Sequence, residues 1–251
     1  DGSIGASWHS YVHDGVVAPP IQEDETASVV FVFAQLYQAT KDKKILSDFY
    51  ESMIRPMANF MAEYIDETTG LPKPSYDLWE EVYMTTTYTT ATVYAGLLAA
   101  ADLADESDDP DMAVHWRAVA GDIYTAAHKH LYNDERKAFY KGLNVKNGQI
   151  EKDAKLDMSS LFGAFMYGLF PSDGNEFKSA LETTRSTFLS DDTTIGMPRY
   201  ENDTYRRIDK WEASNWWIIT TLWMAQYYVE SEEHDKVRTI LDWVNLRSLK
   251  T

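Results

Sequence analysis

The sequence predicts an all-α fold in which helices pair into two concentric layers, and three observations support this. Apolar residues recur with helical spacing along nearly the whole chain of 251 residues. Segments that are apolar all round roughly alternate with amphipathic segments, as expected if inner helices are covered on both sides and outer helices on one. The strong strand pattern is confined to residues 139–153.

Four helices are predicted in the first half of the chain, over residues 25–40, 45–65, 90–105 and 109–132. The first is apolar almost all round, whereas the second carries one apolar stripe and is amphipathic. Pro56 lies inside the second helix and predicts a kink, because proline has no backbone N–H to donate. The third is rich in alanine, which favours a helix. The fourth begins with Asp109 and Pro110, which suit an N-cap and a first helical residue.

The second half of the chain contains a predicted hairpin and four further helices. Asn147-Gly148 at the centre of residues 139–153 suits a type I′ hairpin turn. The helices cover residues 156–170, 176–189, 215–229 and 235–249. No close internal repeat or low-complexity linker interrupts this pattern, so we expect residues 1–251 to form a single domain.

The composition argues against several classes of partner and site. The net charge is −17 and the pI about 4.6, which argues against nucleic acid and anionic membranes. No apolar run reaches membrane-spanning length. The absence of cysteine excludes disulfides and leaves the compartment open. His9 and His13 have the spacing of a helical zinc pair, but no third ligand is obvious, so we expect no metal site.

Three polar clusters stand in the connections between the predicted helices. Two connections, residues 66–88 and 190–214, are long, and long structureless connections in compact domains are usually functional. The first contains SYDLWEEV (75–82), and the second contains RYENDTYRR (199–207). The third cluster, PIQEDET (20–26), precedes the first helix. We therefore expect a site built from loops at one end of a helical toroid.

The acidic octapeptide suits glycosidic cleavage, which needs a protonated carboxylic acid and a second carboxylate. Glu80 and Glu81 are not expected to form that pair, since consecutive residues usually point in different directions. One of them can be the acid while the other contacts the substrate. Their repulsion, with Asp77 near and Trp79 excluding water, would keep one carboxylic acid protonated. The alternative is an exposed loop before a helix N-terminus, where acidic residues are favoured anyway.

The other two clusters also allow two interpretations. Gln22 and Asp24 can bind sugar hydroxyls, or they can decorate a helix N-terminus with Asp24 as its cap. Arg199 and Asp203 can form a hydroxyl-binding pair or a salt bridge within a loop.

Taken together, the three clusters resemble glycoside hydrolase family 15, the glucoamylase family. YDLWEEV (76–82) resembles the family's general-acid segment. RYENDTY (199–205), followed by NWWI (215–218), resembles its sugar-binding segment. PIQEDETA (20–27) is similar to a substrate loop of the prokaryotic members. The order and approximate spacing of the motifs match over nearly the whole chain.

The resemblance implies an (α/α)6 toroid with its site where the inner helices begin. It assigns Glu80 as general acid and Glu81 as a substrate contact beside it. The other positions that it places at the site, as substrate-binding or supporting residues, are Asp77, Trp79, Gln22, Asp24, Arg199, Asp203 and Trp217. Trp216 stands where the family has proline, which puts the local turn in question. This chemistry needs no metal and no organic cofactor.

Two departures from the family pattern concern the ends of the chain. The family's general base should follow the last predicted helix, and an early Arg-Asp pair should precede Asp1. We therefore expect the central part of a catalytic domain, an incomplete toroid with about eight of twelve helices. Apolar inner helices would then be exposed, and a missing partner segment or an oligomer would cover them.

The resulting hypothesis is a glycosidase that releases glucose from the nonreducing end of an α-glucoside with inversion. Glu80 protonates the leaving oxygen, and the base lies outside this chain. The substrate is an oligosaccharide or disaccharide, with maltooligosaccharide, trehalose, dextran and isomaltose left open. A non-catalytic carbohydrate-binding toroid is the alternative. A terpene-cyclase-like enzyme using the SDDPD segment (107–111) is a more distant one.

Overall fold

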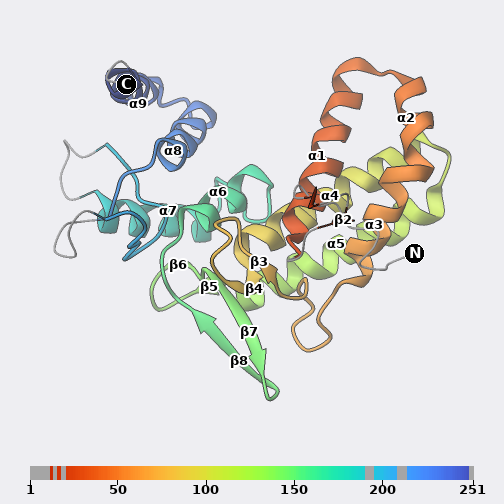
Figure 1. The fold of residues 1–251 in the computed structure, drawn as a ribbon, viewed down its shortest axis with the longest axis horizontal. Coiled ribbons are helices and arrows are strands. Elements are labelled where there is room, and N and C mark those ends of the chain that lie inside the picture. Colours follow the sequence, from red (N-terminus) through yellow and green to blue (C-terminus); the bar gives the residue numbers. More distant parts are fainter. Residues whose placement is uncertain (1–11, 14–15, 18–20, 190–194, 208–213, 249–251) are drawn as a thin grey trace.

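The helices of the computed structural model form an arc of two layers (Figure 1), described over residues 12–13, 16–17, 21–189, 195–207 and 214–248. One row of helices consists of α1 (Glu23–Thr40), α4 (Thr87–Glu106), α6 (Met158–Met166) and α8 (Ile218–Glu230), each packed against the next. The second row covers the first and consists of α2 (Lys43–Phe49), α3 (Arg55–Glu63), α5 (Pro110–His130), α7 (Asn175–Phe188) and α9 (His234–Ser248).

This arrangement confirms the predicted fold class, an incomplete (α/α)6 toroid. Each predicted helix is present, and the row α1, α4, α6 and α8 is the inner layer. Helix α4 contributes to both apolar cores, one shared with α1, α3 and α5 and the other with α6 and α8. The inner helices at the two ends of the row expose apolar side chains, with Val32 on α1 63% exposed and Val229 on α8 55% exposed.

The kink predicted at Pro56 takes the form of a π-helical turn. The π-helix η2 (Tyr50–Ile54) separates α2 from α3, and the Arg55 N–H donates to the Tyr50 carbonyl. Proline cannot donate to the carbonyl four residues earlier, and its ring clashes with that carbonyl in a regular α-helix. The wider π turn relieves both problems just before the proline.

The predicted hairpin is present, but it belongs to a larger sheet than expected. Strands β7 (Gly142–Lys146) and β8 (Gln149–Asp153) are joined by Asn147 and Gly148, both with positive φ as a type I′ turn requires. Strands β3 (Ser75–Tyr76) and β4 (Tyr83–Thr86) extend this pair into a four-stranded sheet with the order β3-β4-β7-β8. Both added strands are too short for an alternating sequence pattern, so the prediction of one small hairpin was incomplete.

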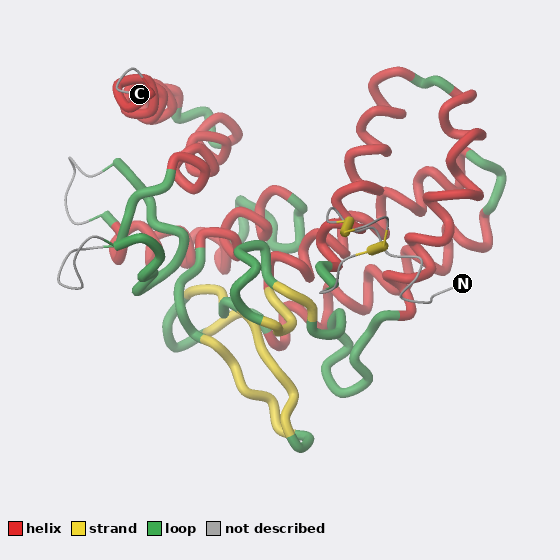
Figure 2. Tube along the Cα trace, viewed as in Figure 1, coloured by secondary structure: helices red, strands yellow, loops and turns green. Residues whose placement is uncertain are grey.

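Short two-residue strands form two further pairs, in yellow with the sheet in Figure 2. They are β1 (Val12–His13) with β2 (Val16–Val17), and β5 (Tyr132–Asn133) with β6 (Ala138–Phe139). His13 therefore lies in a strand and cannot share a helical face with His9, which lies outside the described residues. Among the helices of the described segments, none combines the length and apolar character needed to cross a membrane.

Candidate functional site

The three polar clusters meet at the end of the arc where the inner helices begin. SYDLWEEV folds as a hairpin in which residues 77–82 connect β3 to β4, directly before α4. The Tyr76 N–H donates to the Ile21 carbonyl at 2.9 Å, which ties this hairpin to the segment before α1. The Met158 N–H at the start of α6 donates to the Arg199 carbonyl at 2.9 Å. The loops before α1, α4, α6 and α8 thus form one continuous surface.

Asp77 organises the backbone of the acidic loop. Its buried carboxylate accepts hydrogen bonds from the N–H groups of Glu81 at 2.8 Å and Val82 at 3.0 Å. Its carbonyl accepts one from the Glu80 N–H at 2.8 Å. Glu80 takes a left-handed conformation with φ of 58°, which non-glycine residues adopt only where the surroundings hold them there.

Trp79 does not shield the two glutamates as the sequence suggested. Its indole Nε1 donates to both carboxylate oxygens of Asp157 at 3.1 Å, and its ring packs 5.7 Å from Trp223. Trp79 therefore anchors the loop to the N-terminus of α6, and Glu80 beside it is exposed.

Arg199 lies at the centre of the sugar-binding segment and is only 5% exposed. Its guanidinium pairs with Asp203 through Nε at 2.8 Å and Nη2 at 2.9 Å, and with Glu81 through Nη2 at 2.8 Å. The Tyr200 hydroxyl donates to the other oxygen of Glu81. The predicted pair is thus a buried bidentate ion pair that also reaches the acidic loop.

The ion pairs at Arg199 control the protonation of both partners. Burial acts to lower the pKa of Arg199, but the hydrogen bonds to Asp203 and Glu81 outweigh it and raise this pKa. Burial acts to raise the pKa of Asp203, but the Arg199 guanidinium holds it below its usual value. Both groups are therefore charged near neutral pH.

Aromatic rings surround the Arg199 guanidinium. Its central carbon lies 4.8 to 5.3 Å from the ring centroids of Trp79, Tyr200, Tyr205 and Trp217. Cation–π contacts of this kind hold a guanidinium in place. The rings also offer apolar faces beside charged hydrogen-bonding groups, the combination that a sugar requires.

Trp217 occupies the N-cap position of α8, and its turn forms without the family's proline. The Trp217 N–H donates to the Met197 carbonyl at 2.9 Å, and Asn215 Nδ2 donates to the Tyr205 and Arg206 carbonyls. Trp216 packs directly over Gly196, where a Cβ atom would lie 2.5 Å from the indole. Glycine at 196 therefore makes room for the Trp216 indole.

The cluster before α1 contributes buried groups to the site. Gln22 Nε2 donates to the Asp77 carbonyl at 3.2 Å, and Gln22, not Asp24, is the N-cap residue of α1. Asp24 lies in the first turn and is buried, so the alternative that it caps the helix was wrong. Burial raises the pKa of Asp24 to about 7, and the negative charges of Glu25 and Asp77 act in the same direction.

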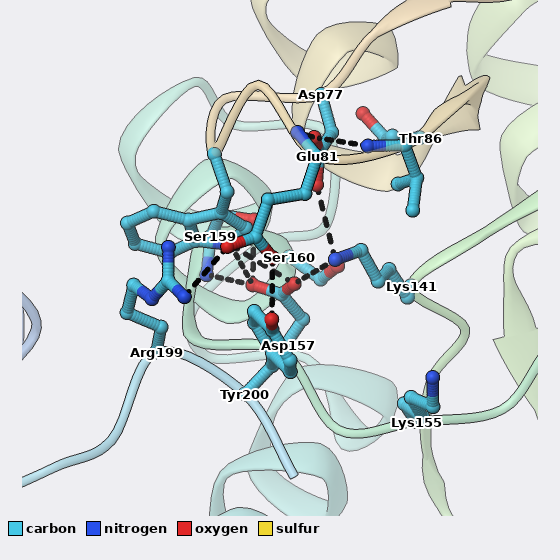
Figure 3. A network of polar contacts seen from close by, with 12 residues as sticks. Asp77, Glu81, Thr86, Lys141, Lys155, Asp157, Ser159, Ser160, Arg199 and Tyr200 are labelled. Carbon is cyan, nitrogen blue, oxygen red and sulfur yellow. Dashed lines mark hydrogen bonds and ion pairs between the residues drawn. The ribbon is translucent and has the colours of Figure 1, made fainter. Parts of the chain in front are cut away.

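Sequence reasoning missed two residues at the centre of the polar network in Figure 3, Lys141 and Asp157. Lys141 Nζ lies 3.0 Å from Asp77 and 3.2 Å from Asp157. Asp157 caps α6 through Ser159, a pattern that could have been recognised at the start of a predicted inner helix. Lys141 lies next to the β-hairpin and carries no local signal.

The same surface offers no evident metal site. Within the described ranges, no group of three or more His, Asp or Glu side chains is placed to hold a metal ion. The polar groups of the site instead pair with one another or line its surface.

Comparison with known proteins decides the family. Residues 11–243 match the model of glycosyl hydrolases family 15. The chain belongs to this family. An uncharacterized glycosyl hydrolase of Methanocaldococcus jannaschii is 27% identical over 224 residues, which are 88% of this chain and 33% of that protein. The chain thus spans about a third of the length of this curated relative.

Solved structures share the fold. A bacterial glucoamylase complexed with acarbose superposes with a TM-score of 0.67 at 20% identity, covering 86% of this chain and 34% of that chain. A glycosidase variant in complex with glucose superposes with a TM-score of 0.72 at 17% identity, covering 92% of this chain and 56% of that chain. At 20% and 17% identity these structures show that the fold is shared. The reaction must instead be inferred from the side chains of the site described above.

Proposed function

We propose that the protein containing this chain is a glycoside hydrolase that releases glucose from the nonreducing end of an α-glucoside with inversion. The supporting observation is the division of roles within the acidic loop. Asp77 and Glu81 form ion pairs with Lys141 and Arg199, and Glu80 is exposed on a backbone whose N–H donates to the Asp77 carbonyl. The position that the family resemblance gives to the general acid thus lies at the surface of the site, where it can reach a bound glycosidic oxygen.

In this mechanism Glu80 gives its proton to the leaving oxygen as the bond from C1 breaks. A water molecule attacks C1 from the opposite face and loses its proton to a second carboxylate. Inverting enzymes separate the two carboxyls by roughly 6.5–9.5 Å to leave room for that water. We place this base outside the chain, as the family resemblance implies.

Arg199 and Glu81 would bind the sugar hydroxyls, and the buried Asp203 would orient the Arg199 guanidinium. Arginine offers donors and the Glu81 carboxylate offers acceptors, in an arrangement already fixed before the sugar arrives. The carboxylates of the site outnumber its two buried cations, which favours the positive charge that develops on the sugar ring. Trp79 and Trp217 supply flat apolar walls, and Asp24 and Gln22 lie at the neighbouring edge.

The supported substrate is a glucose oligosaccharide or disaccharide. Two structural relatives bind ligands, one acarbose and the other glucose.

The test is glucose release from maltose, maltotriose, isomaltose and trehalose, with Glu80→Gln as the critical variant. Glu67→Gln, an exposed glutamate of the same connection, is the matched control. We expect Glu80→Gln to abolish release by the protein that contains this chain, while Glu67→Gln leaves it unchanged. Equal release by Glu80→Gln and wild type would refute the assignment of the acid.

The alternative is a carbohydrate-binding protein without turnover. The exposed ring of Tyr205 beside Arg199 favours saccharide contact whether or not a bond is cleaved. Calorimetric titration with maltotriose, combined with the glucose-release assay, distinguishes the two functions when both are measured on the protein that contains this chain. Binding without glucose release, unaffected by Glu80→Gln, would support the binding protein.

A further inference from the structure

Lys141 is a buried cation placed between the acidic loop, the start of α6 and Tyr200 of the sugar-binding segment. It follows β6 and precedes β7, and it is 4% exposed. Its ammonium lies 3.0 Å from Asp77 on the acidic loop, 3.2 Å from Asp157 at the start of α6, and 4.3 Å from the ring centroid of Tyr200. Figure 3 shows these groups converging on one nitrogen.

The two carboxylates that Lys141 joins hold opposite flanks of Glu80. Asp157 accepts the indole N–H of Trp79, the residue before Glu80. Asp77 accepts the backbone N–H of Glu81, the residue after it. Each flank of the proposed acid therefore depends on a carboxylate that pairs with the same ammonium.

The backbone of Lys141 is fixed as firmly as its side chain. Its N–H donates to the Asp153 carbonyl at 2.8 Å, and its carbonyl accepts from the Thr87 N–H at 3.0 Å. The end of β8 and the first residue of α4 thus hold the lysine from both sides. Because the backbone of Lys141 is held in place, its ammonium has a fixed position against Asp77 of the acidic loop.

The charge of Lys141 is needed where it lies. Asp77 and Asp157 are both buried and would repel each other across the space that the ammonium fills. Burial acts to lower the pKa of Lys141, but the carboxylates of Asp157 and Asp77 outweigh it and raise this pKa above its ordinary value. The lysine is consequently charged at neutral pH, and the buried carboxylates keep a partner.

We propose that Lys141 is a positioning residue of this site, whose ammonium joins Asp77 to Asp157 and so holds the Glu80 loop against the sugar-binding segment. Lys141 acts through these carboxylates and not on the sugar. Its importance for turnover rests on the proposed role of Glu80, whereas its hold on the loop does not.

The first test measures the loop itself by hydrogen exchange. Lys141→Met keeps the length of the side chain and removes the charge, Lys141→Arg keeps the charge, and Lys155→Met is a control at an exposed lysine nearby. We expect the amides of Glu81 and Val82 to exchange roughly tenfold faster in Lys141→Met, with α9 unchanged. The indole N–H resonance of Trp79 should shift in the same variant only.

Three outcomes of the exchange experiment decide whether Lys141 positions the Glu80 loop. Selective acceleration in residues 77–82, largely reversed in Lys141→Arg, supports the proposal. Unchanged exchange in Lys141→Met overturns it. Uniform acceleration that includes α9 also overturns it, because Lys141 would then stabilise the whole fold without a specific hold on the loop.

The second test is a kinetic comparison in the protein that contains this chain. We expect Lys141→Met to lower kcat by roughly 10- to 100-fold with a smaller change in KM, because Arg199 still holds the sugar. A rise in KM with unchanged kcat would contradict positioning of the acid. If the wild type releases no glucose, the proposed function fails, and hydrogen exchange alone still decides the role of Lys141.

Discussion

Arg199 and Glu81 form an ion pair of 2.8 Å although 118 positions separate them in the sequence. The pair joins the two long connections that the sequence singled out. It also turns Glu81 away from the role of acid, because its second oxygen accepts the Tyr200 hydroxyl. The proposed assignment of Glu80 rests on its exposed position in the acidic loop and on the family resemblance, with Glu81 beside it held by Arg199.

Replacing Arg199 by lysine should weaken sugar binding. Lysine keeps the positive charge but cannot donate to Asp203 through two nitrogens while also reaching Glu81. We expect Kd for maltotriose to rise by roughly 10- to 100-fold, since one or two charge-assisted hydrogen bonds are lost. Calorimetric titration measures this change directly.

Arg117→Lys is the matched control for this variant. Arg117 also pairs with two carboxylates, those of Asp102 and Asp105, but these ion pairs lie on the exposed surface of α4 and α5. Exposed pairs contribute little to stability. An effect of Arg117→Lys as large as that of Arg199→Lys would indicate a general loss of stability and not a local loss at the site.

The inner-helix arrangement and the meeting of the polar clusters could be predicted because their signals are local. Helical spacing identifies each helix, and a loop before an inner helix leads to the same end of the toroid. Asp77, Glu80 and Arg199 were therefore placed together from their sequence positions. The direction of Trp79 could not be predicted, since it depends on Asp157 at a distance of 78 positions.

Lys141 shows the limit of such reasoning most clearly. A lysine beside a hairpin is usually solvated, and nothing in its neighbourhood predicts burial. It becomes buried because β3 and β4 join the hairpin and carry Asp77 with them. The pairing of β3 and β4 with the hairpin brings together distant parts of the sequence. The two strands have two and four residues, which is too short for a periodic pattern that would predict them.

Gly196→Ala should disturb the turn at the start of α8. The new Cβ would lie 2.5 Å from the Trp216 indole, so the ring or the loop must move. Overpacking of this kind typically destabilises by about 1–3 kcal/mol, and Tm should fall by several degrees. Since Trp217 follows directly, we also expect weaker maltotriose binding.

Gly121→Ala provides the opposite expectation at a second glycine. Gly121 lies within α5, and a Cβ there meets nothing within 4 Å. Alanine should stabilise the helix by about 0.5–1 kcal/mol. Thermal melts of the two variants should therefore shift in opposite directions, and a Gly196→Ala variant as stable as wild type would contradict the packing described at Trp216.

Asp24 should make the stability of the protein fall as pH rises. Its ordinary pKa is 3.8, and burial raises the folded value to about 7. Between these values the folded state keeps a proton that the unfolded state has lost, so deprotonation favours unfolding. The effect grows from about pH 4, is complete above about pH 7, and amounts to about 4 kcal/mol.

Asp24→Asn should remove the part of this dependence that Asp24 contributes, because asparagine has a similar shape and no charge. Burial also raises the pKa of the neighbouring Glu23, so a fall in stability of the same direction remains in the variant. We expect the variant to have a higher free energy of unfolding than the wild type at pH 8 and a nearly equal one at pH 4, measured by urea titration. Asp122→Asn, at an exposed position of α5, should leave the pH dependence unchanged. Equal free energies of unfolding for wild type and Asp24→Asn at both pH values would contradict the raised pKa of Asp24.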